Sequence, residues 1–164
     1  MKIPAPPIEH LLALWPEILL TLAACALLVA DIVAPRQKKY MLGWGAFVAS
    51  VVTLLGLLVW PPQTGSIFNG MFLVDTYAAF FKVLFLSATA LTVLISLRYL
   101  DDERIHHGEY YALLLFAALG MMCMASGGDL ISIYLGLELM SLSTYVLVGF
   151  IRRDVVPASW RWAW

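Results

Sequence analysis

The sequence predicts an all-α membrane protein, a polytopic helix bundle with five transmembrane helices. Hydrophobic residues make up 62% of the 164 residues and charged residues only 13%, a balance far from that of a soluble domain. The apolar residues gather in runs close to the roughly 20 residues that a helix needs to cross the hydrocarbon of a bilayer. Backbone groups in lipid are satisfied only in helices or closed barrels, and the two-residue alternation of barrel strands is absent from the sequence.

Five such runs follow one another along the chain. They cover residues 11–33, 41–60, 76–97, 110–126 and 130–151. The residues before the first run include three prolines and no strongly basic segment, and the run itself is longer than the core of a signal peptide. We therefore expect the first helix to be retained.

The outer connections carry turn and capping residues. Residues 61–75 form a loop with two prolines and two glycines, and Asp75 is placed to cap the third helix. Residues 126–129 read Ser-Gly-Gly-Asp, a tight turn in which Asp129 can cap the fifth helix. The last two helices are therefore expected to form a hairpin.

The basic residues that follow helices lie only in alternate connections, which predicts the orientation in the membrane. They follow the first, third and fifth helices, at Arg36, Lys38, Lys39, Arg98, Arg104, Arg152 and Arg153, and none follows the second or fourth. Short cytoplasmic loops are enriched in Lys and Arg. The pattern predicts a multi-pass membrane protein with its amino terminus outside, on the periplasmic or equivalent face, and its three basic connections in the cytoplasm or matrix.

Glu138 is the first candidate for a functional residue, because it is the single charge within residues 130–151. At about 1.5 Å per residue it lies about 12 Å from one end of that helix and about 20 Å from the other. A charge at such depth costs on the order of 2.5–3.5 kcal/mol and is by default a hypothesis of ion or proton handling. A protonated Glu138 that only hydrogen-bonds a neighbouring helix is the structural alternative.

Three polar residues share the helix face of Glu138. Tyr134, Ser141 and Tyr145 lie at positions i−4, i+3 and i+7 from it. A polar stripe of this kind suits a hydrated path for protons. We expect it to face the inside of the bundle, near the third or fourth helix.

Other charges near helix ends have two interpretations each. Lys82, about two turns into the third helix, either extends to the membrane interface or is a counter-charge for Glu138. Glu17 is either interfacial or caps the helix that begins near Pro16. Asp31 is expected to pair with the basic loop that follows it.

The chain offers little for other chemistry. The net charge of −1 argues against a nucleic-acid partner, and no phosphate-binding, metal-binding or dithiol motif is present in the sequence. Cys25 and Cys123 are expected to be small buried hydrophobic residues. His106 and His107 are expected in a solvated loop, and no cofactor is predicted to bind this chain.

Two long stretches resemble a known family. Residues 128–150 (GDLISIYLGLELMSLSTYVLVGF) and 109–122 (EYYALLLFAALGMM) resemble the N subunit of proton-pumping NADH:quinone oxidoreductase, respiratory complex I. The LGLEL-x-SL core is quite specific. Residues 15–18 (WPEI) and 74–82 (VDTYAAFFK) look similar to the same subunit, so the resemblance covers most of residues 8–153.

This resemblance implies a function in a larger complex. It implies a membrane-arm subunit taking part in proton translocation coupled to electron transfer from NADH to quinone, two molecules that the whole complex uses. The expected partners are other membrane-arm subunits and the lipid bilayer. Glu138 matches the key glutamate of the family's fifth helix, which is coupled to a lysine on a later helix.

The chain also departs from the family. Such subunits continue for many more helices, and residues 154–164, with Trp160, Trp162 and Trp164, no longer resemble them. We expect residues 1–153 to be the N-terminal five-helix part and 154–164 an atypical tail of a truncated or frameshifted product. The alternatives are a noncatalytic membrane scaffold or remnant, and a subunit of a cation/proton antiporter.

Overall fold

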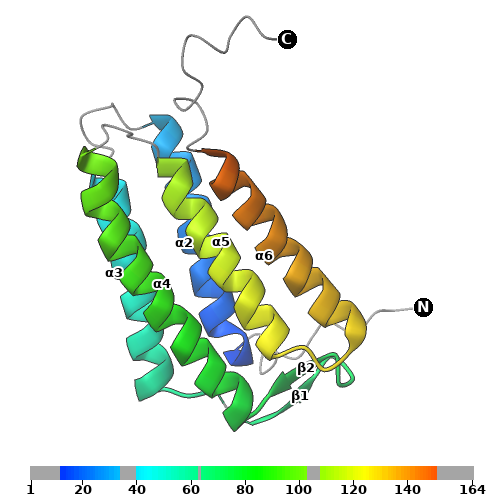
Figure 1. The fold of residues 1–164 in the computed structure, drawn as a ribbon. Coiled ribbons are helices and arrows are strands. Elements are labelled where there is room, and N and C mark those ends of the chain that lie inside the picture. The colour runs from blue at the N-terminus through cyan, green and yellow to red at the C-terminus, as the bar shows by residue number, and fades with distance from the viewer. Residues whose placement is uncertain (1–11, 34–39, 63, 103–107, 151–164) are drawn as a thin grey trace, which may run out of the picture.

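A five-helix bundle is the main feature of the computed structural model, which describes residues 12–33, 40–62, 64–102 and 108–150 (Figure 1). The helices are α2 (Trp15–Val33), α3 (Tyr40–Val59), α4 (Thr76–Asp102), α5 (Gly108–Ala125) and α6 (Leu130–Phe150). All five are long and apolar enough to cross a membrane, which confirms the predicted fold class. The Trp-rich tail and every basic loop residue except Arg98 lie outside the described residues.

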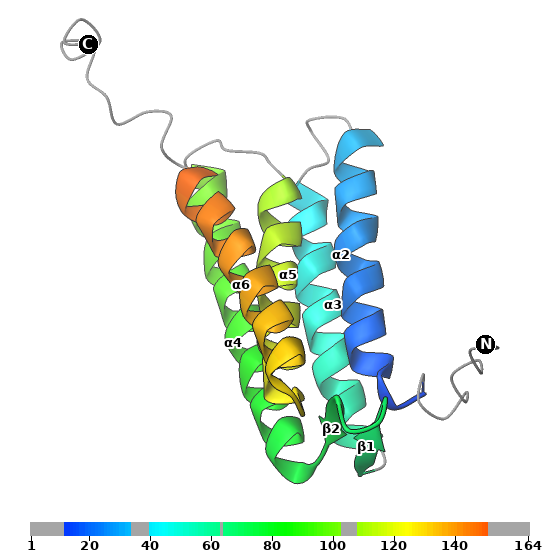
Figure 2. The ribbon, with the colours of Figure 1, turned by 90° about the vertical axis from the view of Figure 1, so that its right-hand side faces the viewer.

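Successive helices run in opposite directions, and α5 lies at the centre (Figures 1 and 2). It packs against α2, α3, α4 and α6, and it is the most buried of the five helices. Leu115, Ala118 and Met122 of α5 are fully enclosed and join Leu20 of α2 and Leu86 of α4 in one apolar core. In contrast, α6 is the least buried helix and packs mainly along α5.

A short antiparallel hairpin lies across one end of the bundle, where α4 begins and α5 ends (Figure 2). Strands β1 (Gly65–Ile67) and β2 (Phe72–Val74) pair with Ile67 opposite Phe72. The sequence predicted only a loop here, because three-residue strands are too short to show a periodicity. The connecting turn places Phe68, Asn69 and Gly70 at φ values of 53°, 56° and 92°.

Backbone hydrogen bonds attach the hairpin to the turn between α5 and α6. Leu73 N–H donates to the carbonyl of Ser126 at 2.7 Å, and Gly128 N–H donates to the carbonyl of Met71 at 2.9 Å. Two connections far apart in the sequence are thereby held together at one end of the bundle.

Three aspartates act as helix caps. The Oδ1 atoms of Asp75 and Asp129 each accept a hydrogen bond at 2.7 Å, from the N–H groups of Ala78 and Ser132, which confirms both predicted caps. The hydroxyl and the N–H of Ser132 lower the pKa of the exposed Asp129 carboxyl below its usual value. Asp31 caps α5, since its Oδ1 accepts the N–H of Gly108 at 2.9 Å. The basic loop that Asp31 was expected to pair with lies outside the described residues.

Glycines allow α5 and α6 to approach at the level of their backbones. A Cβ on Gly120 would lie 2.6 Å from the carbonyl oxygen of Gly136, and a Cβ on Gly136 would lie 2.9 Å from that of Gly120. Small residues commonly permit such contacts between membrane helices. This pair sets both the separation of the two helices and the rotation of α6 about its axis.

Replacing Gly120 by Leu is therefore expected to destabilise the bundle by at least the roughly 1–3 kcal/mol typical of overpacking. Unfolding in mixed SDS micelles, followed by helix content, measures the effect. The matched control is Gly149→Leu, because a Cβ at Gly149 meets no atom of the described residues within 4 Å. Equal loss of stability in the two variants would contradict a close contact at Gly120.

Candidate functional site

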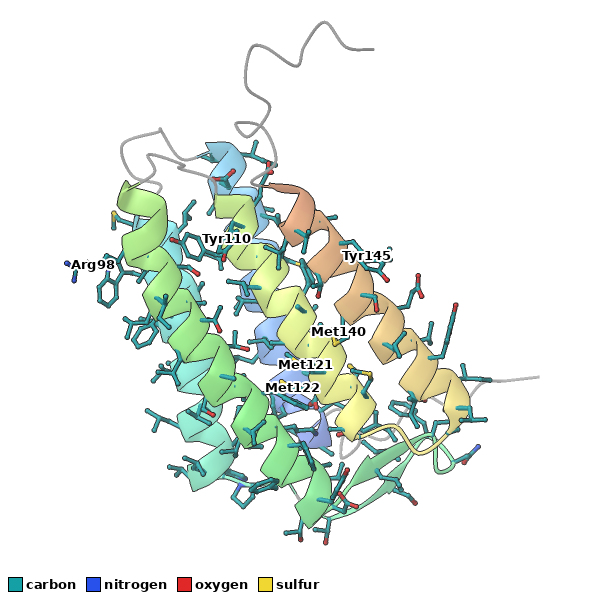
Figure 3. All side chains as sticks on the ribbon, viewed as in Figure 1. Arg98, Tyr110, Met121, Met122, Met140 and Tyr145 are labelled. Atoms are coloured by element: carbon teal, nitrogen blue, oxygen red, sulfur yellow. The ribbon has the colours of Figure 1, made fainter. Side chains whose placement is uncertain are left out.

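The stripe that contains Glu138 lies on the side of α6 that faces away from α5. Gly136 touches the backbone of α5, and Ser143, only 5% exposed, lies on the same side of α6. Successive helical residues are about 100° apart, so Glu138 points roughly opposite to Gly136. Figure 3 shows the same division, with Met140 between α5 and α6 and Tyr145 on the outer side of α6.

The exposures of the stripe agree with this placement. Tyr134 is 62% exposed and Tyr145 is 71% exposed, while Glu138 and Ser141 are half-buried beside them. Among the described residues, the Glu138 carboxylate has no recorded hydrogen bond or ion pair. The expectation that Glu138 faces the third or fourth helix is therefore wrong for this bundle, because the glycine contact turns the opposite side of α6 toward α5.

A second pair of charges lies inside the bundle. Lys82 of α4 and Glu17 of α2 form an ion pair, with Nζ 2.7 Å from Oε1 and with side chains only 1% and 8% exposed. Lys82 therefore does not extend to the membrane interface, and it pairs with Glu17 where Glu138 was one expected partner. Glu17 lies in the first turn of α2, near the end of the bundle, but its side chain is buried against Lys82 and is not exposed at the surface.

The ion pair lies under the hairpin, with an aromatic ring over the ammonium group. The centroid of the Phe72 ring is 5.3 Å from Lys82 Nζ, within cation–π range. The thiol of Cys123, on α5, is close enough to interact electrostatically with both charges. Apart from Lys82, neither oxygen of the Glu17 carboxylate has a hydrogen-bond partner in the part of the chain that the structure describes.

A signal for this pair was available in the sequence. Glu17 and Lys82 lie near the starts of two helices that run in the same direction, so both charges belong at a similar depth near the same end of the bundle. Opposite charges at equal depth in lipid-embedded helices are expected to find each other. Each charge was expected either at the interface or in another interaction, Glu17 as a cap and Lys82 with Glu138, so the pairing was missed.

Other possible sites offer little chemistry. Among the described residues, no group of three His, Cys, Asp or Glu side chains could hold a metal ion, and His106 and His107 lie outside that part. A cavity of about 560 Å³ between the hairpin-side ends of α2 and α3 is mainly apolar and includes Trp15 and Trp60 in its lining. Of the two thiols, Cys25 is exposed on α2, contrary to expectation, and Cys123 is half-buried.

Lys82→Met is expected to destabilise the bundle by about 3–5 kcal/mol, because Glu17 then loses its counter-charge and must either stay charged in the interior or take up a proton. Glu17→Gln combined with Lys82→Met should recover most of that loss, since both buried charges are then gone. The four proteins of this double-mutant cycle are compared by unfolding in mixed SDS micelles. Additive effects of the two substitutions would show that the pair does not interact.

The bundle and its charges define a class: a polytopic membrane protein with ionisable groups within its spanning helices. No protein-family model matches the chain. The chain is 44% identical over 159 residues to NADH-quinone oxidoreductase subunit N 1 of Koribacter versatilis, covering 89% of this chain and 30% of that relative. It is 42% identical over 147 residues to subunit N 2 of Rhizobium meliloti, covering 90% and 31%.

A third relative agrees with these two. The chain is 41% identical over 146 residues to NADH-quinone oxidoreductase subunit N of Anoxybacillus flavithermus, covering 87% of this chain and 29% of the relative. The chain is thus a homologue of NADH-quinone oxidoreductase subunit N, as its sequence resemblance indicated, and it spans about 30% of the length of the curated relatives that it matches.

Proposed function

We propose that this chain is part of a membrane-arm subunit of NADH:quinone oxidoreductase and takes part in proton translocation coupled to electron transfer from NADH to quinone. The proposal rests on one observation above all, the polar stripe around Glu138 on the uncovered side of α6 in a homologue of subunit N. NADH and quinone are used by the whole complex, and this chain binds neither. Its role is that of a translocase subunit without redox chemistry of its own.

The proposed proton path requires other helices against the uncovered side of α6. A glutamate facing lipid is costly, so in a membrane the stripe has to be covered by protein, reached by water or protonated. More than two thirds of the length of the relatives lies outside the part that matches this chain. We propose that further helices of such a subunit, or neighbouring membrane-arm subunits, cover Tyr134, Glu138, Ser141 and Tyr145 and complete a path in which Glu138 relays protons.

The arrangement of the helix ends supports the proposed orientation. The C-terminal ends of α2, α4 and α6 lie at one end of the bundle and the hairpin at the other (Figure 1). All basic loop residues of the sequence follow those three helices. Under the positive-inside rule, the hairpin and the amino terminus would lie outside the cell inner membrane.

A noncatalytic scaffold is the second candidate function. Its support is that Glu138 has no recorded partner among the described residues and that both tyrosines of the stripe are exposed. In that case the five helices would pack against partner proteins without moving protons. A cation/proton antiporter subunit, the third alternative, has no observation of its own in its favour.

Proton transport distinguishes these functions. We expect the purified chain in liposomes to conduct no protons above the lipid background, because the stripe lacks a covered path across roughly 30 Å of hydrocarbon. Glu138→Gln should change nothing there but should lower proton pumping when introduced into a full-length subunit N within an assembled complex. An entrapped pH dye reports both results. A Glu138-dependent leak through the isolated chain would show that five helices suffice, and undiminished pumping in the complex would favour the scaffold.

The orientation is tested with reporter fusions. A reporter enzyme that works only in the cytoplasm should be active when joined after Lys39. A reporter enzyme that works only after export should be active when joined after Gly65, within β1. The reverse pattern would overturn the proposed sidedness.

A further inference from the structure

The five helices contain a complete carboxylate–ammonium pair that is separate from the stripe of Glu138. We propose that Glu17 and Lys82 form a second intramembrane proton-binding site, at which the Glu17 carboxylate exchanges a proton with water on the hairpin side of the bundle. This proposal does not rest on the function proposed for Glu138. It concerns the opposite side of α5, where α2 and α4 pack.

One oxygen of the Glu17 carboxylate, Oε2, is available to accept a proton. Oε1 faces Lys82 Nζ at 2.7 Å, whereas Oε2 is buried and has no hydrogen bond to another of the described residues. Two more buried polar atoms at the hairpin side of the bundle, Trp15 Nε1 and Ser126 Oγ, also lack a hydrogen-bond partner within the part of the chain that the structure describes. Buried polar atoms without protein partners are the groups that bind internal water, which can deliver a proton to Oε2.

The protonation step is balanced. A proton from water on the hairpin side adds to Oε2, the carboxylate becomes a neutral carboxylic acid, and Lys82 keeps its three protons and its charge. The face of the Phe72 ring, 5.3 Å from Nζ, then remains as a neutral contact for the ammonium group. The reverse step returns the proton to water and restores the ion pair.

Few other titratable groups face this site. Lys82 comes from α4 and the Cys123 thiol from α5, and both interact with Glu17. Strands β1 and β2 have no titratable side chain, and α3 has none apart from Tyr40, at the far end of the bundle. Glu138 lies on the side of α6 that faces away from α5. Lys82 is thus the one nearby cation among the described residues that pairs with the Glu17 carboxylate.

Burial of this pair is not explained by packing alone. Replacing a buried ion pair by apolar side chains of similar size is often neutral or stabilising, so α2 and α4 did not need charges in order to pack.

The pair also lies close to the hairpin end of the bundle. Counted at about 1.5 Å per residue, Lys82 lies about 9 Å from the start of α4 and Glu17 about 3 Å from the start of α2.

The hairpin is the cover over this shallow site. It is held by two backbone hydrogen bonds to the α5–α6 turn, from Leu73 to Ser126 and from Gly128 to Met71, and by the buried side chains of Ile67 and Val74. The rest of the hairpin is largely exposed, and exposed segments open more readily than the core of a protein. Transient opening of the hairpin would connect Glu17 to the water outside.

Infrared difference spectroscopy tests the proton-binding site in the 164-residue chain, held in nanodiscs of phosphatidylethanolamine and phosphatidylglycerol. Between neutral and acid pH we expect a carboxylic C=O band that shifts in D2O, is lost in Glu17→Gln and is kept in Glu138→Gln. In Lys82→Met the band should be present already at neutral pH, because a buried carboxylate without its counter-charge takes up a proton. A band unchanged by Glu17→Gln, or absent at neutral pH in Lys82→Met, would overturn the proposal.

The cover is tested separately with the native thiol of Cys123, in a Cys25→Ser background. A Cβ on Gly128 would collide with the carbonyl of Gly70, so Gly128→Ala should displace the hairpin, whereas Gly65→Ala meets nothing within 4 Å and is the matched control. We expect a water-soluble thiol reagent to label Cys123 at least about tenfold faster in Gly128→Ala than in Gly65→Ala. A factor of that size corresponds to the loss of one or two of the hydrogen bonds that hold the hairpin. Equal labelling rates in the two variants, with helix content intact in both, would contradict access through the hairpin.

Discussion

The contact between the backbones of α5 and α6 determines which side of α6 packs against the bundle and which side is left uncovered. Gly120 and Gly136 bring the two helices so close that the carbonyl oxygen of each glycine occupies the space that a Cβ on the other would need. This contact fixes the rotation of α6, and the rotation places Glu138 and its three polar neighbours on the side away from α5. The candidate proton relay is thus directed outward from the five helices by two residues that carry no chemistry of their own.

The intramembrane charges show two solutions to one energetic problem. Glu17 and Lys82 are enclosed by α2, α4, α5 and the hairpin, and each reduces the desolvation cost of the other. Glu138 has no recorded partner among the described residues and lies on the least buried helix. A charge pair completed within the bundle and a single carboxylate on its uncovered side suit different roles, the first a local exchange of protons and the second a connection to further helices.

The hairpin links these features at one end of the bundle. It covers the ion pair through Phe72 and is bonded to the turn from which α6 begins. A displacement of that turn would therefore reach both the cover over Glu17 and the first residues of α6. The two candidate sites lie on different sides of α5 but share this one connection.

The sequence by itself determined the five helices, their alternating directions and the caps at Asp75 and Asp129, because hydrophobic length and capping are properties of short segments. It also carried the resemblance to subunit N through the residues around Glu138. Only the tertiary structure decided that Lys82 pairs with Glu17, that Asp31 caps α5 and that Glu138 faces outward. Each of these depends on the rotation and depth of one helix against another. Contacts between segments far apart in the chain, such as Gly120 with Gly136, set that rotation and depth. The hydrophobic pattern of a helix does not reveal which of its sides packs against a neighbouring helix.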